Sequence, residues 1–235
     1  MPPVVSLMQA VRYCERGSSA EFWAEPLNAI TNAAYVAAAL VGWALVRSSR
    51  LSNPDRGWLI CLIALIASIG VGSAAFHTAP SVLTKLGDVV PIALFVVAAL
   101  FVALTRVLSM SVPVAFGQLA LLGAVSVVIA RGGEWIGCVD GSCLNGAPGY
   151  LPVLAALVMT ASAVWRAKSA SAPSLMLASG AFAAALTART LDLVACPLGT
   201  IGSIAITAHA LWHLGTALTA YLVLRGLALG LRVTS

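Results

Sequence analysis

The chain has 235 residues, of which 60% are hydrophobic and only 9% are charged. Soluble domains carry about 25% charged residues, so this composition excludes a soluble globular protein and indicates a polytopic membrane protein. The net charge is +5, but the basic residues are scattered singly near the ends of apolar runs, as expected of loop anchors. This pattern does not indicate a nucleic-acid partner.

The first 25 residues precede the apolar runs and form an N-terminal segment, residues 1–25. Its charged side chains are dense for so sparsely charged a chain: Arg12, Glu15, Arg16, Glu21 and Glu25. The first span is predicted over residues 26–46, because Pro26 suits a first helical turn, where its missing N–H costs nothing. Asn28 and Asn32 share one helix face, so this face is expected to look into the bundle.

Six further apolar runs follow, each with roughly the length of 17–25 residues that a bilayer requires, the fifth span being the shortest. They are predicted over residues 57–77, 86–105, 112–130, 150–164, 174–191 and 199–224. The fold class is therefore all-α, a polytopic membrane protein built as a seven-transmembrane helix bundle. The bundle is expected over residues 26–225, with a short tail over residues 226–235.

The basic residues indicate the orientation of this bundle, because cytoplasmic loops are enriched in Lys and Arg. With the N-terminus outside, the inner side carries eight of them: Arg47, Arg50, Arg56, Arg106, Arg166, Lys168, Arg225 and Arg232. The outer side carries five: Arg12, Arg16, Lys85, Arg131 and Arg189. We therefore expect an extracytoplasmic N-terminus and a cytoplasmic C-terminus. Because nearly all basic residues are Arg, as in GC-rich bacteria, we expect a bacterial inner membrane.

Four of the five cysteines fall on the outer side in this orientation, Cys14, Cys138, Cys143 and Cys196, whereas Cys61 lies near the inner end of the second span. An oxidising face favours disulfides, and four cysteines allow three connectivities. Cys138 and Cys143 share one short loop. If they pair, Cys14 and Cys196 would tie the N-terminal segment to the loop before the seventh span. Four free thiols are the alternative.

The three histidines of the chain all lie in or beside apolar runs, where polar side chains are costly and need a reason. His209 and His213 fall on one face of a helix, one turn apart, and can reach one metal ion. His77 ends the second span. For the pair alone, the alternative is a hydrogen-bonded contact between helices. The third histidine favours a zinc site of three neutral imidazoles with a fourth position open.

Two further polar residues are expected beside these histidines, in the outer half of the bundle. Ser73 lies one turn before His77, and Asp88 lies near the outer start of the third span. His209 and His213 are expected about ten to fourteen residues into the seventh span, at a depth that suits Ser73. Asp88 would act as general base and then general acid, and Ser73 would donate a hydrogen bond to a developing oxyanion. The alternatives are a helix N-terminal charge for Asp88 and a small packing residue for Ser73.

Taken together, these motifs resemble the alkaline ceramidase family, which belongs to a superfamily of seven-helix membrane hydrolases that includes the adiponectin-type receptors. The shared pattern is a Ser and a His in the second helix, an Asp in the third and His-x-x-x-His in the seventh. All five positions match in this chain: Ser73, His77, Asp88, His209 and His213. Residues 24–32 also resemble the start of the family's first helix. Residues 192–196 resemble the end of its sixth helix, and there the resemblance implies a disulfide between Cys196 and Cys14.

The resemblance implies that the protein hydrolyses the amide of ceramide or of a related lipid to a long-chain base and a fatty acid. Zinc would be held by the three histidines, and the lipid would enter from the bilayer. A related amide or ester is an alternative substrate, since many bacteria lack ceramide. A receptor-like sensor with structural zinc, or a transporter, is the alternative class. The sequence does not indicate an oligomeric state.

A calcium site near the N-terminus is also implied by the resemblance, with Glu15 and Glu25 as its candidate ligands. Arg12 and Gly17, however, stand where the family has an Asp and an Asn, and Arg16 adds positive charge. Calcium requires several oxygen ligands. The sequence therefore does not favour calcium at this site.

Overall fold

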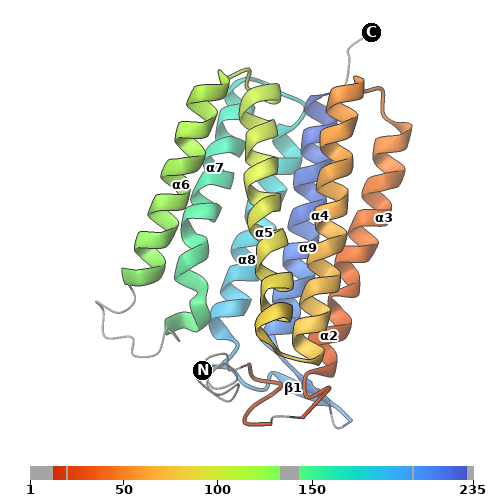
Figure 1. Cartoon of the computed structure of the whole chain (residues 1–235), viewed down its shortest axis with the longest axis vertical. Coiled ribbons are helices and arrows are strands. Elements are labelled where there is room, and N and C mark those ends of the chain that lie inside the picture. The colour runs from red at the N-terminus through yellow and green to blue at the C-terminus, as the bar shows by residue number, and fades with distance from the viewer. Residues whose placement is uncertain (1–12, 20, 133–142, 203, 232–235) are drawn as a thin grey trace.

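The apolar runs form long helices in the computed structural model, which describes residues 13–19, 21–132, 143–202 and 204–231 (Figure 1). The first half of the chain forms α2 (Pro26–Thr31), α3 (Ala33–Ser48), α4 (Asn53–Thr78), α5 (Val82–Val102), the π-helical turn η1 (Ala103–Val107) and α6 (Val112–Gly132). The second half forms the 3₁₀ helix η4 (Cys143–Tyr150), α7 (Leu151–Arg166), α8 (Ala172–Leu191), β1 (Gly199–Ile201), β2 (Ile204–Ile206) and α9 (Ala208–Gly230).

Six helical stretches of the described residues are long and apolar enough to cross a membrane. They are Pro26–Ser48, Asn53–Thr78, Val82–Val107, Val112–Ile129, Asn145–Arg166 and Ala172–Leu191. α9 has 23 residues, about 35 Å at 1.5 Å per residue, but His209, His213 and Arg225 lower its hydropathy. α9 packs against α8, α3 and α4, so protein covers much of its surface and that part need not be apolar. The chain is a multi-pass membrane protein.

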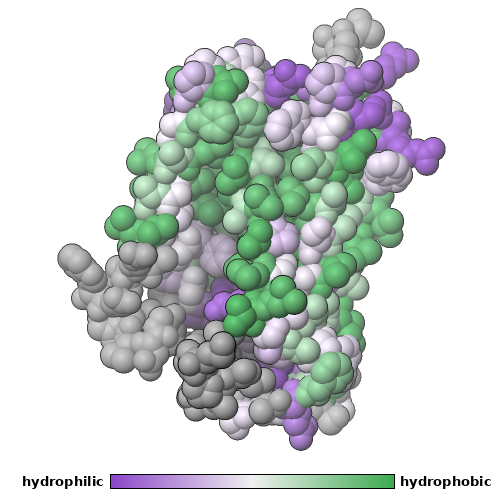
Figure 2. All heavy atoms as spheres, viewed as in Figure 1, coloured by the Kyte–Doolittle hydropathy of each residue, from purple (hydrophilic) through white to green (hydrophobic). Residues whose placement is uncertain are grey.

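The outward faces of the bundle are apolar, as a lipid environment requires. Leu40 on α3, Leu94 on α5 and Leu121 and Val128 on α6 are all exposed. Figure 2 shows hydrophobic side chains over the middle of the bundle and hydrophilic ones at its upper end, over the turn between α3 and α4. This distribution matches the apolar interior and polar boundaries of a bilayer.

The interior changes character along the bundle. Towards the upper end, fully buried leucines of α4, α8 and α9 pack together: Leu59, Leu62, Leu175, Leu224 and Leu227. Towards the lower end, where α2 begins and α4 ends, the buried side chains are polar, among them Asn28 and Asn32. The expectation that these two asparagines look into the bundle is confirmed.

Residues 199–206 depart from the sequence prediction, which starts the seventh span at residue 199. The structure has an antiparallel hairpin of β1 and β2 there. Gly202 adopts a left-handed φ of 61° at its turn, and the β-branched residues around it favour strands. Thr207 then caps α9, its hydroxyl accepting from the Ala210 N–H, so the helix begins only at Ala208. The predicted start is therefore wrong, and the described fold is helical apart from this hairpin.

One disulfide fixes the N-terminal segment to the lower end of the bundle. Cys14 and Cys196 are bonded, with their Cα atoms 5.5 Å apart, which confirms that pairing. Cys61 is a free, exposed thiol. Cys138 lies outside the described residues, and with it the predicted bond to Cys143. Tyr13 and Cys14 are thereby held near the start of α9.

Candidate metal centre and active site

Three histidines meet at the lower end of the bundle, where α4 ends and α9 begins (Figure 1). Each is at most 2% exposed. The ring centroids lie 5.1 Å apart for His77 and His209, 4.8 Å for His77 and His213, and 4.6 Å for His209 and His213. One ring nitrogen of each lies within 4.8 Å of the others, close enough to hold one metal ion.

The two histidines of α9 occupy its first two turns, level with the last turn of α4. The prediction that they lie ten to fourteen residues into the seventh span is wrong, because the hairpin takes up the residues before Ala208. The late start of the helix is what places His209 and His213 opposite His77. The structure thus brings together the three histidines that the sequence selects, but with His209 and His213 at the start of their helix and not in its middle.

Hydrogen bonds to Nδ1 orient two of the three imidazoles. His77 Nδ1 lies 2.5 Å from Glu25 Oε2, and a carboxylate accepts, so the ring donates. His213 Nδ1 lies 3.0 Å from Thr31 Oγ1, whose own proton goes to a backbone carbonyl one turn earlier, so this ring donates too. In both rings Nε2 keeps its lone pair, the arrangement typical of metal-binding histidines. Among the described residues, His209 Nδ1 is buried without a partner. Three imidazoles that each bring one ring nitrogen to the same point fit Zn²⁺.

The partner of His77, Glu25, is itself held by a buried arginine. The Arg16 Nε donates to Glu25 Oε1, and the two side chains are 4% and 1% exposed. A second guanidinium nitrogen of Arg16 donates to the His77 carbonyl at 3.0 Å, and a third to the Glu21 carbonyl at 3.2 Å. Burial alone would raise the pKa of Glu25, but His77, Asn28 and Arg16 outweigh it and hold that pKa below its ordinary value. Arg16 therefore supports His77 at both its side chain and its backbone.

The two carboxylates implied as calcium ligands are both occupied by other partners. Glu25 bonds Arg16 and His77 as described, and Asn28 Nδ2 donates to it at 3.0 Å. Glu15 accepts the N–H groups of Leu27 and Asn28, at 2.7 and 2.8 Å, and so caps α2. Burial raises the pKa of Glu15, which these two bonds oppose. A calcium ion would have to compete with the guanidinium for Glu25, so these residues do not fit calcium.

Asp192, directly after α8, ties the N-terminal segment to α9. Its carboxylate accepts the His209 N–H at 2.8 Å and the Cys14 N–H at 3.1 Å. Burial raises the pKa of Asp192, and these two bonds oppose the rise. The Tyr13 ring covers the imidazole of His209, with centroids 4.2 Å apart. The segment that carries Cys14 thus forms one wall of the histidine cluster.

Ser73 and Asp88 face each other where α4 and α5 cross. Among the side chains, His77 and Ser73 act most strongly on the Asp88 carboxyl, so both lie close to it. The crossing is close because Gly72 and Gly87 meet backbone to backbone: a Cβ on Gly72 would lie 1.9 Å from the Gly87 oxygen. The close crossing, which the two glycines allow, therefore places Ser73 and Asp88 near His77.

A side chain at residue 72 is expected to separate these helices. Gly72→Ala places a methyl group against backbone that cannot rotate away, an overpacking that costs about 1–3 kcal/mol. The measurement is the melting temperature of the detergent-solubilised protein. Gly180→Ala is the matched control, because its Cβ would meet nothing within 4 Å. An unchanged melting temperature for Gly72→Ala would contradict the close crossing.

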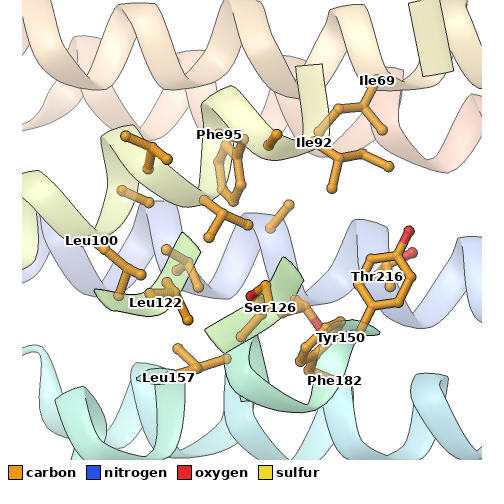
Figure 3. A pocket seen from close by; sticks show the side chains of 18 of the residues that line it. Ile69, Ile92, Phe95, Leu100, Leu122, Ser126, Tyr150, Leu157, Phe182 and Thr216 are labelled. Atoms are coloured by element: carbon orange, nitrogen blue, oxygen red, sulfur yellow. The ribbon is translucent and has the colours of Figure 1, made fainter. Parts of the chain in front are cut away.

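An apolar cavity of about 390 Å³ lies beside the site, between α5, α6, α7 and α9 (Figure 3). Apolar side chains form its walls: Ile92, Phe95, Leu122, Leu157 and Phe182. The histidines and Asp88 do not line it, but Val89 and Trp212, their neighbours in sequence, do. Its volume lies within the range of small-molecule sites. The polar cluster thus adjoins a space suited to an apolar chain.

Several residues of the site were missed by the sequence prediction. Tyr13, Arg16 and Asp192 contact the histidines or their partners, and Thr31 holds His213. Glu25 was selected, but as a calcium ligand and not as the partner of His77. The available signal was the density of charge in residues 1–25, which is unusual in so apolar a chain.

Comparison with known protein families gives one match across nearly the whole chain. The family described as Ceramidase matches residues 9–233. A comparison with individual curated proteins gave no match.

Proposed function

Since the chain belongs to the ceramidase family, we propose that it is a zinc-dependent intramembrane hydrolase that cleaves the amide bond of ceramide or of a related lipid. The observation that carries this proposal is the buried group of three histidines, beside Ser73 and Asp88, next to an apolar cavity. A lipid amide has a polar centre on an apolar chain, and this arrangement offers a matching environment for each part. The products would be a long-chain amine and a fatty acid.

His77, His209 and His213 would hold the zinc. Zinc bound by imidazoles polarises a carbonyl and makes water a better nucleophile at neutral pH. Asp88 takes the proton of the attacking water and passes it to the leaving amine. Ser73 donates a hydrogen bond that orients Asp88 or stabilises the developing oxyanion. Glu25 and Thr31 keep two of the imidazoles in the tautomer that leaves Nε2 free.

We also propose that α9 completes seven spans, with residues 1–25 outside and residues 226–235 inside. α2 begins and α9 ends at opposite ends of the bundle, as an odd number of crossings requires (Figure 1). The Cys14–Cys196 disulfide supports an oxidising environment at the lower end. The active site then lies in the outer half of the membrane, and the basic residues support a bacterial inner membrane.

Metal analysis together with a lipid hydrolysis screen tests this function. The purified protein is expected to contain about one zinc per chain, and His77→Ala, His209→Ala and His213→Ala are each expected to lose it. Mass spectrometry of a panel of lipid amides and esters should detect turnover that depends on zinc. Full zinc occupancy in any two of the variants would contradict the proposed site. A wild-type protein that holds zinc but cleaves none of the panel would favour a sensor.

A further inference from the structure

Arg189, in the last turn of α8, is a half-buried cation whose guanidinium packs on two aromatic rings of the bundle. Its guanidinium carbon lies 5.3 Å from the centroid of the Tyr150 ring and 5.1 Å from that of Trp212. Its Nε is buried and has no hydrogen-bond partner among the described residues. Among the described residues, Arg16 and His77 pair with Glu25 and Arg106 pairs with Asp55. No ion pair there involves Arg189. An intramembrane charge of this kind is costly unless a partner neutralises it.

The cation lies close to the proposed reaction site. The Trp212 ring, on which the guanidinium packs at 5.1 Å, belongs to the residue directly before His213. One aromatic side chain of α9 therefore lies between the guanidinium and the histidine cluster. Asp88, His209 and His213 all lie within electrostatic reach of this charge.

The same cation borders the apolar cavity. Tyr150 and Trp212, on which the guanidinium packs, both line that cavity, and Figure 3 shows Tyr150 at its edge with Phe182 and Thr216 nearby. An acyl chain in the cavity would present its polar end between Arg189 and the histidines. The two rings hold the guanidinium in place by cation–π contact, but they do not neutralise its charge.

We propose that Arg189 binds an anionic group, a carboxylate, phosphate or sulfonate, that the lipid substrate carries close to its scissile amide. This inference rests on the proposed function and ranks its substrates, with anionic amide lipids preferred over neutral ones such as ceramide. A guanidinium presents a planar set of donors that matches such oxyanions, and the unpartnered Nε supplies one of them. The anion would supply a direct ion-pair partner, which the described residues do not provide.

A matched pair of lipids tests the proposal: N-palmitoylglycine, which carries a carboxylate, and N-palmitoylethanolamine, which has a neutral hydroxyl in its place. The wild type is expected to prefer the anionic lipid about tenfold or more in kcat/KM, because charge-assisted hydrogen bonds discriminate by this amount. Arg189→Gln should lose that preference, because its kcat/KM should fall about tenfold or more on the anionic lipid relative to the neutral one. Arg189→Lys should keep part of it. Arg166→Gln, an exposed arginine at the end of α7, is the control and should change neither.

Equal turnover of the two lipids by the wild type, or an equal loss on both in Arg189→Gln, would overturn the proposal. If Arg189→Gln does not fold, the wild-type preference alone decides. If the wild type hydrolyses neither lipid, turnover of ceramide decides the proposed function, and the change in tryptophan fluorescence on binding of each lipid tests the subsite. The proposal would still be supported if the wild type bound N-palmitoylglycine more tightly than the neutral lipid and Arg189→Lys kept part of this difference. Equal binding of the two lipids would refute it.

Discussion

Replacing Asp88 with asparagine is expected to slow lipid hydrolysis at least about a hundredfold and to leave the protein folded with its zinc bound. Asparagine keeps the size of the side chain and its ability to form hydrogen bonds, but its amide cannot take a proton from water. Asp88 is not one of the three residues whose ligand atoms converge, so zinc binding should not need it. Single-turnover hydrolysis, zinc content and melting temperature are the measurements.

Two comparisons make this result specific. Ser73→Ala should cost less than Asp88→Asn, because a water can replace one hydrogen bond. Asp55→Asn, at the other end of α4 and paired with Arg106, should leave turnover unchanged. Near-normal turnover in Asp88→Asn would remove Asp88 from the mechanism. Loss of zinc in that variant would make Asp88 a metal ligand and require another proton carrier.

Replacing Arg16 with methionine is expected to lower the free energy of unfolding by about 3–5 kcal/mol, because it leaves the buried carboxylate of Glu25 without its cation. The loss of the Arg16 bond to the His77 carbonyl and the freed Glu25 should also weaken zinc binding about 10–100-fold. Melting temperature and zinc titration are the measurements. The double variant Arg16→Met with Glu25→Gln should recover part of the stability, since it buries no unpaired charge.

The control for this prediction is Arg106→Met. Arg106 pairs with Asp55 at 2.8 Å, but its side chain is 42% exposed, so its loss should cost less than about 1 kcal/mol. Equal destabilisation by the two substitutions would contradict the role given to Arg16. Calcium is not expected to raise the melting temperature of the wild type, because Glu25 is already paired. A calcium-dependent rise would show that the ion displaces the guanidinium.

The helical spans follow from the sequence because a bilayer imposes a length and an apolar character on every segment that crosses it. The runs that become α4, α6 and α8 are recognisable within a few residues of their ends. The start of α9 is not recognisable in this way, because residues 199–206 form an apolar run that could equally be a pair of strands or part of a helix. Only the turn at Gly202 and the cap at Thr207 separate the strands from the helix.

The residue types available for chemistry follow from the sequence alone. Three histidines, one serine and one aspartate in or beside apolar runs are energetically costly, and their spacing limits what they can do. How these residues are held depends on the tertiary structure. Arg16 and Glu25 meet His77 across 61 and 52 residues, and Thr31 meets His213 across 182. Such contacts depend on where helices cross, as α4 and α5 do at Gly72 and Gly87. The local periodicity of a sequence does not specify where two helices cross.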